Sequence, residues 1–328
     1  MRALGLMILV VLFIQSCGQS DCRNVADLES PEMITIVRTE SDLFKSQTVG
    51  DVIDYFKKYP SLANYFWHRS QYPSDTILAG RTFSLIKHPS TDTVYQESIQ
   101  AFDAATNVEA DLGEAFGRLK QLYPNAKTPK VYTAVSVFYN DLFVSDSVVV
   151  LGLDHFIGKD ATYAPQDIPE YILQRYTTDN IPAIIMQFIS GFYVRAGDKE
   201  TMLSDIIDFG KTYYLNSRLL PCTPEHIIMG YSEETMKDVR QNQEVIWANF
   251  VENELLYDTD HFIKKKFLSE RPSVYEIGEK CPGRIGAWVG WQIVESYMAN
   301  NDVSITDLMA DTDHHRIFEL SGYKPRNE

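Results

Sequence analysis

Two β-rich runs lie between long stretches of helical character, and this arrangement limits the folds open to the chain. The first run, 131–138, alternates partly between apolar and polar residues, whereas the second, 148–153, is almost wholly apolar. An apolar strand of that kind is typically buried on both faces. The connection contains the turn-favouring pair Asn140-Asp141. We therefore predict a β-hairpin over 130–154.

The rest of the chain predicts helices. Apolar residues recur at spacings of three and four over 41–124, and helical patterns resume over 165–310. A short first strand is expected at 33–37. No internal repeat or Gly/Ser-rich linker divides the sequence. We predict a predominantly α-helical α+β fold, with a small hairpin or sheet packed on helices, in a single domain of residues 31–328.

The N-terminal segment has the pattern of a bacterial lipoprotein signal. A basic start at Arg2 is followed by an apolar run over 4–14 that is too short to span a membrane, and then by Cys17. We expect cleavage of residues 1–16, acylation of Cys17 with chains such as palmitate, and a lipidated tether over 17–30. The alternative is a short buried helix with an ordinary cysteine.

The charge of the chain limits its partners. The formal net charge is -15, and no lysine- or arginine-rich stripe counteracts it. An acidic surface repels phosphate backbones, so a nucleic-acid partner is not expected. Attraction to anionic headgroups is also weak, and the expected membrane contact is the lipid anchor itself.

Three further cysteines remain after Cys17. Cys222 and Cys281 are the better candidates for a disulfide in an oxidising periplasm, which would leave Cys22 unpaired. The alternative is that Cys222 and Cys281 are buried free thiols. No C-x-x-C motif supports thiol exchange or a cysteine zinc site.

A glycine-rich apolar segment, 281–298, predicts a core helix. Gly286 and Gly290 place two positions without side chains one turn apart. Each glycine costs a helix about 1 kcal/mol, so the pair indicates a close approach by a neighbouring element. Trp288 and Trp291 flank this gap.

Two stretches carry a family resemblance. The segments 151–160 and 281–298, together with 163–171 and the lipoprotein start, resemble the gliding-motility lipoprotein B family of Bacteroidetes. The resemblance covers most of the mature chain. That family in turn is similar to predicted zinc peptidases in its order of strands, helix and glycine-rich helix. The resemblance therefore implies a zincin-like scaffold.

The zinc motif of such a peptidase is absent where the resemblance places it. A zinc hydrolase needs two helical ligands four residues apart and a carboxylate beside the first. The matching positions are Met186, Gln187 and Ser190. A thioether binds zinc poorly, an amide cannot act as a base, and a serine hydroxyl is not a usual ligand. No metal and no cofactor are therefore expected.

No other constellation clearly replaces that motif. No two histidines stand four apart on a predicted helix, and nucleophile-elbow and nucleotide-binding motifs are missing. Asp154 and His155 meet at the end of the predicted hairpin, where they could border a cleft. One alternative is therefore a hydrolase with an unrecognised site that uses this pair. Another is a surface lipoprotein that binds glycans through its tryptophans.

We favour a non-catalytic lipoprotein, a pseudoenzyme that binds a protein partner in the cell envelope. The resemblance implies a role with gliding and type IX secretion, or with a related envelope assembly. The expected location is the outer membrane, facing the periplasm. Tyr193, Trp288 and Trp291 are candidate aromatic anchors for the partner, and they could equally be core residues.

Overall fold

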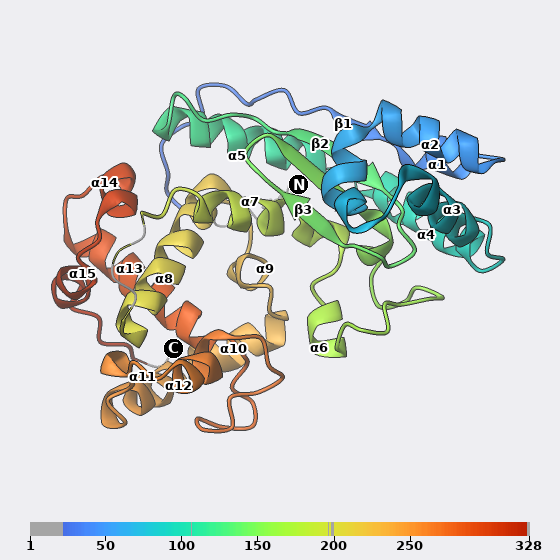
Figure 1. Ribbon diagram of the computed structural model, residues 1–328. Helices are drawn as coiled ribbons and strands as arrows, with labels where there is room; N and C mark the ends of the chain where they lie inside the picture. Colours follow the sequence, from blue (N-terminus) through green and yellow to red (C-terminus); the bar gives the residue numbers. More distant parts are fainter. Residues whose placement is uncertain (1–21, 106, 196, 198–199, 327–328) are drawn as a thin grey trace, which may run out of the picture.

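The computed structural model describes residues 22–105, 107–195, 197 and 200–326. Figure 1 shows a small sheet with one group of helices on its right and a larger group on its left and below. The first group comprises α1 (Glu40–Phe44), α2 (Val49–Lys58), α3 (Asp75–Ile86) and α4 (Thr91–Ala104), while α5 (Val108–Leu122) runs along the top. A π-helical turn, Leu62–Phe66, and a short 3-10 turn, Arg69–Gln71, join α2 to α3.

Helices also make up most of the chain after the sheet. They are α6 (Glu170–Leu173), α7 (Ile181–Gly191), α8 (Met202–Leu219), α9 (Glu225–Met229), α10 (Glu233–Gln241), α11 (Gln243–Glu252), α12 (His261–Leu268), α13 (Ile285–Asn300), α14 (Ile305–Ala310) and α15 (His314–Ser321). Short 3-10 turns occur at Leu153–His155, Thr178–Asn180 and Leu255–Tyr257. The prediction of a mainly helical α+β fold is confirmed.

The sheet has four strands in the order β1-β2-β4-β3, with bounds β1 (Ile36–Arg38), β2 (Lys130–Ala134), β3 (Leu142–Val144) and β4 (Val148–Gly152). β2 pairs in parallel with β1 and with β4, so that Val131 lies between Ile36 and Val149. β4 faces the core on both sides. Val149 and Leu151 contribute to a core formed mainly with α5, α7, α8 and α13, whereas Val150 contributes to the core under α2 and α3. The prediction of a strand buried on both faces is confirmed.

The predicted hairpin between the two β-rich runs is wrong. These runs form β2 and β4, which are parallel, and the observed hairpin joins β3 to β4. Residues 142–144, expected in the connection, form a strand because the chain already reverses at 135–141. β4 can then enter between β2 and β3, the central position that suits a strand without a polar face.

Glycine allows α8 and α13 to pack backbone to backbone. A Cβ on Gly290 would lie 1.7 Å from the carbonyl oxygen of Ile206, and a Cβ on Gly210 would lie 2.2 Å from the carbonyl oxygen of Gly290. A Cβ on Gly286 would lie 2.9 Å from Cδ2 of Leu268. The predicted close approach at Gly286 and Gly290 is confirmed, and the neighbouring element at Gly290 is α8.

The segment 22–35 packs against the helices. A disulfide joins Cys22 to Cys222, just beyond the end of α8. Arg23 donates to the carbonyl oxygen of Thr223 at 2.7 Å, and the amide of Glu32 donates to the carbonyl oxygen of Gly113 in α5 at 2.8 Å. Residues 22–30 of the expected tether are thus fixed to the domain, while Cys17 and residues 1–16 lie outside the described residues.

The predicted pairing of Cys222 with Cys281 is wrong. Cys222 bonds to Cys22, which the path of 22–35 along α5 brings to the end of α8. Cys281 is a buried free thiol, and burial raises its pKa to about 12. The alternative of a buried free thiol therefore holds for Cys281 and not for Cys222.

Candidate functional site

The helix α7 presents different residues to the core and to a cavity. The helix begins at Ile181 after the N-cap residue Asn180, with Pro182 in its first turn, where a missing amide proton is tolerated. Met186 and Ser190 are fully buried in the core, whereas Gln187 borders the cavity. The side chains of α7 that line this cavity are Ala183, Ile184, Gln187 and Phe188.

We call this space the α7 cavity, and it has a volume of about 250 Å3. Its apolar wall comes from α7, from Leu142 on β3, from Phe156 after the 3-10 turn that follows β4, and from α9. Polar side chains complete it. The lining residues outside α7 are Asp141, Leu142, Phe156, Arg175, Tyr176, Tyr213, Ile227, Ile228, Met229, Gly230, Glu270 and Arg284.

Two arginines meet one carboxylate at the wall of the α7 cavity. Oε1 of Glu270 lies 2.7 Å from Nη1 of Arg175 and 2.8 Å from Nε of Arg284. Arg284 also donates through Nη1 to the hydroxyl oxygen of Tyr213 at 2.8 Å, and through Nη2 to the carbonyl oxygen of Met229 at 2.8 Å. Four side chains, from segments far apart in sequence, are thus linked in one polar chain.

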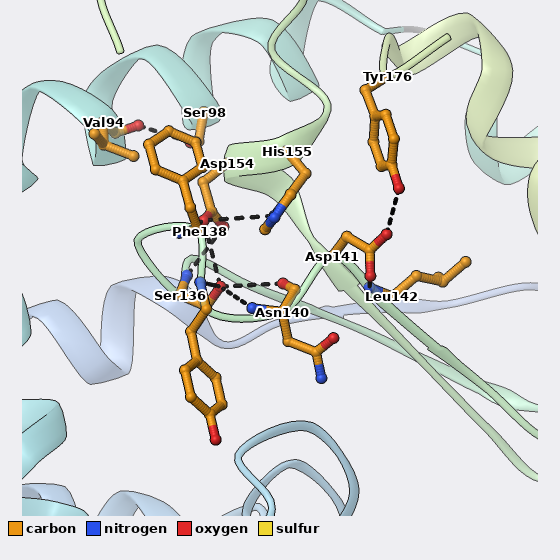
Figure 2. Close-up of polar contacts among 11 residues, drawn as sticks. Val94, Ser98, Ser136, Phe138, Asn140, Asp141, Leu142, Asp154, His155 and Tyr176 are labelled. Carbon is orange, nitrogen blue, oxygen red and sulfur yellow. Dashed lines mark hydrogen bonds and ion pairs between the residues drawn. The ribbon is translucent and has the colours of Figure 1, made fainter. Parts of the chain in front are cut away.

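A second polar pair lines the same cavity. Figure 2 shows the hydroxyl of Tyr176 pointing to the carboxylate of Asp141, to which it donates a hydrogen bond. The other carboxylate oxygen accepts from the amide of Leu142 at 2.7 Å. Burial, and then this contact with Asp141, raises the pKa of Tyr176. The phenol therefore stays protonated at neutral pH.

Two of the three positions of the degenerate zinc motif lie on a side of α7 that does not face the α7 cavity. A ligand at Met186 or Ser190 would point into the core and away from the cavity. A motif that faces the cavity would instead fall on Ala183, Ile184 and Gln187. None of these side chains is a usual zinc ligand or a general base. Within the described residues, no group of three His, Cys, Asp or Glu side chains is arranged to hold a metal.

Asp154 organises the turn after β2. Its carboxylate accepts hydrogen bonds from the amides of Ser136, at 3.0 Å, and Phe138 (Figure 2). Val137 and Phe138 have φ of 55° and 63°, a left-handed conformation that costs energy for such side chains. The carboxylate is fully buried, and burial raises its pKa. Asp154 therefore acts as a turn residue.

His155 faces a larger second cavity of about 670 Å3, which also borders Asp154 and Tyr176. Nδ1 of His155 lies 3.7 Å from Oδ2 of Asp154, too far for a hydrogen bond, and has no hydrogen-bond partner among the described residues. The expectation that the pair borders a cleft is confirmed. Ser136 contacts Asp154 and not His155, so the three do not form a catalytic triad.

The three candidate aromatic anchors line neither cavity. Trp288 is fully buried and donates through Nε1 to Glu225 at 3.0 Å, and Trp291 is buried beside it on α13. Tyr193 packs on Tyr123, with ring centroids 4.3 Å apart. The alternative that they are core residues therefore holds for Trp288 and Trp291 on α13, whereas Tyr193 is half-buried and its role as an anchor stays a prediction.

Sequence reasoning missed the polar chain of Arg175, Tyr213, Glu270 and Arg284. One signal was present at Arg284, a charged residue inside an otherwise apolar segment. The other three come from separate segments, and only the fold brings them together.

The fold and the α7 cavity define a mainly helical α+β protein with a largely apolar cavity between its sheet and its helices. A family model described as gliding motility protein GldB matches residues 21–325, and the chain belongs to this family. Membership supports a gliding-motility lipoprotein and an association with the cell envelope. Neither the curated proteins nor the solved structures yield a significant match. No helix in the described part of the chain has the length and apolar character of a membrane span.

Proposed function

We propose that this protein is a non-catalytic lipoprotein that docks a segment of a protein partner in its α7 cavity. It uses a degenerate zinc-peptidase-like scaffold, is anchored through acyl chains on Cys17 at the outer membrane, and faces the periplasm. Its partner belongs to the gliding and type IX secretion apparatus or to a related envelope assembly.

The composition of the α7 cavity carries the proposal. The α7 side of the wall offers Ala183, Ile184 and Phe188, and hydrocarbon there suits an apolar side chain of a partner. Phe188 is 53% exposed, although it belongs to a helix that is otherwise largely buried. An exposed phenylalanine beside a cavity is a typical contact residue at protein interfaces.

The size of the cavity also favours docking of a short segment. Its volume of about 250 Å3 is slightly below the range of roughly 300–1,000 Å3 of pockets for drug-sized ligands. One or two residues of a polypeptide fit such a space, and the rest of the partner would lie on the surface around Phe188.

The test uses a substitution that fills the cavity. Full-length protein with an affinity tag is expressed in its own host as wild type, Ile184→Trp and Ile184→Val. Envelopes are solubilised, and the proteins that copurify are quantified by mass spectrometry. We expect one or more partners to be retained by wild type and Ile184→Val, and lost with Ile184→Trp at unchanged melting temperature. Equal recovery with all three would contradict docking in this cavity.

A further inference from the structure

The α7 cavity presents hydrogen-bond donors whose own acceptors are missing. Oε1 of Gln187 accepts from Nδ2 of Asn216 at 3.1 Å, which leaves the NH2 group of Gln187 on the cavity side. The hydroxyl oxygen of Tyr213 accepts from Arg284, so its proton is free to be donated. Among the described residues, neither of these donors has an acceptor.

Arg175 adds a charged donor to the same wall. Nη1 bonds to Glu270, and the structure gives its remaining N–H groups no acceptor in the described part of the chain. Glu270 is shared by Arg175 and Arg284, and with Asp141 as the second carboxylate the charged side chains of the lining balance in formal charge. The lining is thus free of the net negative charge that the chain carries as a whole, which is -15.

The other carboxylate of the cavity is already engaged. Asp141 accepts from the amide of Leu142 and from the hydroxyl of Tyr176. The donors left without an acceptor in the described part of the chain are therefore those of Arg175, Gln187 and Tyr213. An anionic acceptor such as a carboxylate complements these donors, and hydrogen bonds between charged groups are the strong ones.

We infer that the α7 cavity captures the C-terminal carboxylate of a partner polypeptide. The carboxylate contacts Arg175, Gln187 and Tyr213, and the apolar side chain of the last residue packs against Ala183 and Ile184. Capture of a terminal carboxylate is a recurrent mode of peptide recognition. The inference rests on the proposed docking function and names the chemistry of the segment that is docked.

The test measures peptide binding to the purified full-length protein by fluorescence anisotropy. The peptides are labelled hexapeptides that end in Ala, Val, Leu or Phe, each with a free C-terminal carboxylate or with a C-terminal amide. A third set carries an internal glutamate and a C-terminal amide. We expect at least one free-acid peptide to bind, and its amide to bind roughly tenfold more weakly or worse.

Substitutions in the lining of the α7 cavity test whether the difference in binding between acid and amide peptides arises there. Arg175→Gln and Gln187→Leu should each weaken binding of the free-acid peptide roughly tenfold and leave the amide unaffected. Arg271→Gln is the matched control. Like Arg175, Arg271 is paired with a glutamate, since its Nη1 lies 3.4 Å from Oε2 of Glu276. It borders a neighbouring cavity but not the α7 cavity. This variant should bind like the wild type.

Three results would overturn the inference. They are equal binding of acid and amide peptides, equal or tighter binding of the internal-glutamate set, and no binding of any free-acid peptide. If Ile184→Trp nevertheless abolishes partner recovery, docking stands and only its carboxylate chemistry fails. If Ile184→Trp leaves recovery unchanged while the free-acid peptides bind as expected, the cavity captures a carboxylate but the proposed partner function fails.

Discussion

The carbonyl oxygen of Ile206 on α8 occupies the space where a side chain at position 290 on α13 would begin. A Cβ built on Gly290 lies 1.7 Å from that oxygen, far closer than two non-bonded atoms can approach. A real side chain there would force the backbone of one helix to shift. The contact joins the two longest helices of the larger helical group. It holds α8, which carries Tyr213 and Asn216, in position behind α7.

Gly290→Ala should therefore be strongly destabilising. The added methyl group must push α8 and α13 apart, and we expect a loss of about 3 kcal/mol or more in the free energy of unfolding. Gly80→Ala is the control, because a Cβ there has no atom within 4 Å and alanine favours a helix by about 0.5–1 kcal/mol. Urea denaturation measures the free energy of unfolding of both variants. A Gly290→Ala protein as stable as the wild type would show that the two helices are farther apart.

Loss of the disulfide should loosen the N-terminal segment. The bond between Cys22 and Cys222 closes a separation of 200 residues, and its removal typically costs about 2–5 kcal/mol. We expect Cys22→Ser, Cys222→Ser and the double variant to lose the same amount, since all three break one bond. Additive losses in the double variant, measured by denaturation under oxidising conditions, would argue against the pairing.

The wild-type protein and the variant Asp154→Asn should differ in stability by an amount that depends on pH. Burial raises its pKa above the unfolded value, so the stability that it contributes is complete below the unfolded pKa and falls as pH rises through the folded pKa. Asp154→Asn removes this titration and about 1–3 kcal/mol of stability, because a buried amide cannot accept all the bonds of the turn. The deficit of the variant should be larger at pH 3.5 than at pH 7. Denaturation curves of both proteins at the two pH values measure this loss in the free energy of unfolding. A larger loss at pH 7 than at pH 3.5 would contradict the expected direction of the pH dependence.

Local patterns in the sequence predicted the elements well, because helix periodicity and glycine spacing act over a few residues. Gly286 and Gly290 indicated close packing correctly. The order of strands and the partner of Cys222 depend on contacts between distant segments, which no local pattern encodes. Met186 illustrates the same limit, because the helix was predicted but the side that faces the cavity was not. That side follows from how α7 sits between the sheet and α8.

Metal binding tests the non-catalytic proposal and the orientation of α7 together. Elemental analysis and calorimetric titration of wild-type protein should give well below one zinc per chain. Histidines four residues apart on the cavity side, in Ala183→His with Gln187→His, should create measurable zinc binding. The matched pair Met186→His with Ser190→His points into the core and should destabilise the fold without binding zinc. One tightly bound zinc in the wild type would reopen the enzyme hypothesis.

Cross-linking in living cells tests most directly whether the α7 cavity docks a partner. A photo-reactive amino acid replaces Phe188 at the cavity or, as a control, Phe262 on α12, which is 77% exposed and lines neither the α7 cavity nor the second cavity. We predict a discrete cross-linked envelope protein from position 188, absent from position 262 and lost when Ile184→Trp fills the cavity. The absence of a cross-link at 188, or a cross-link that persists with Ile184→Trp, would contradict the account.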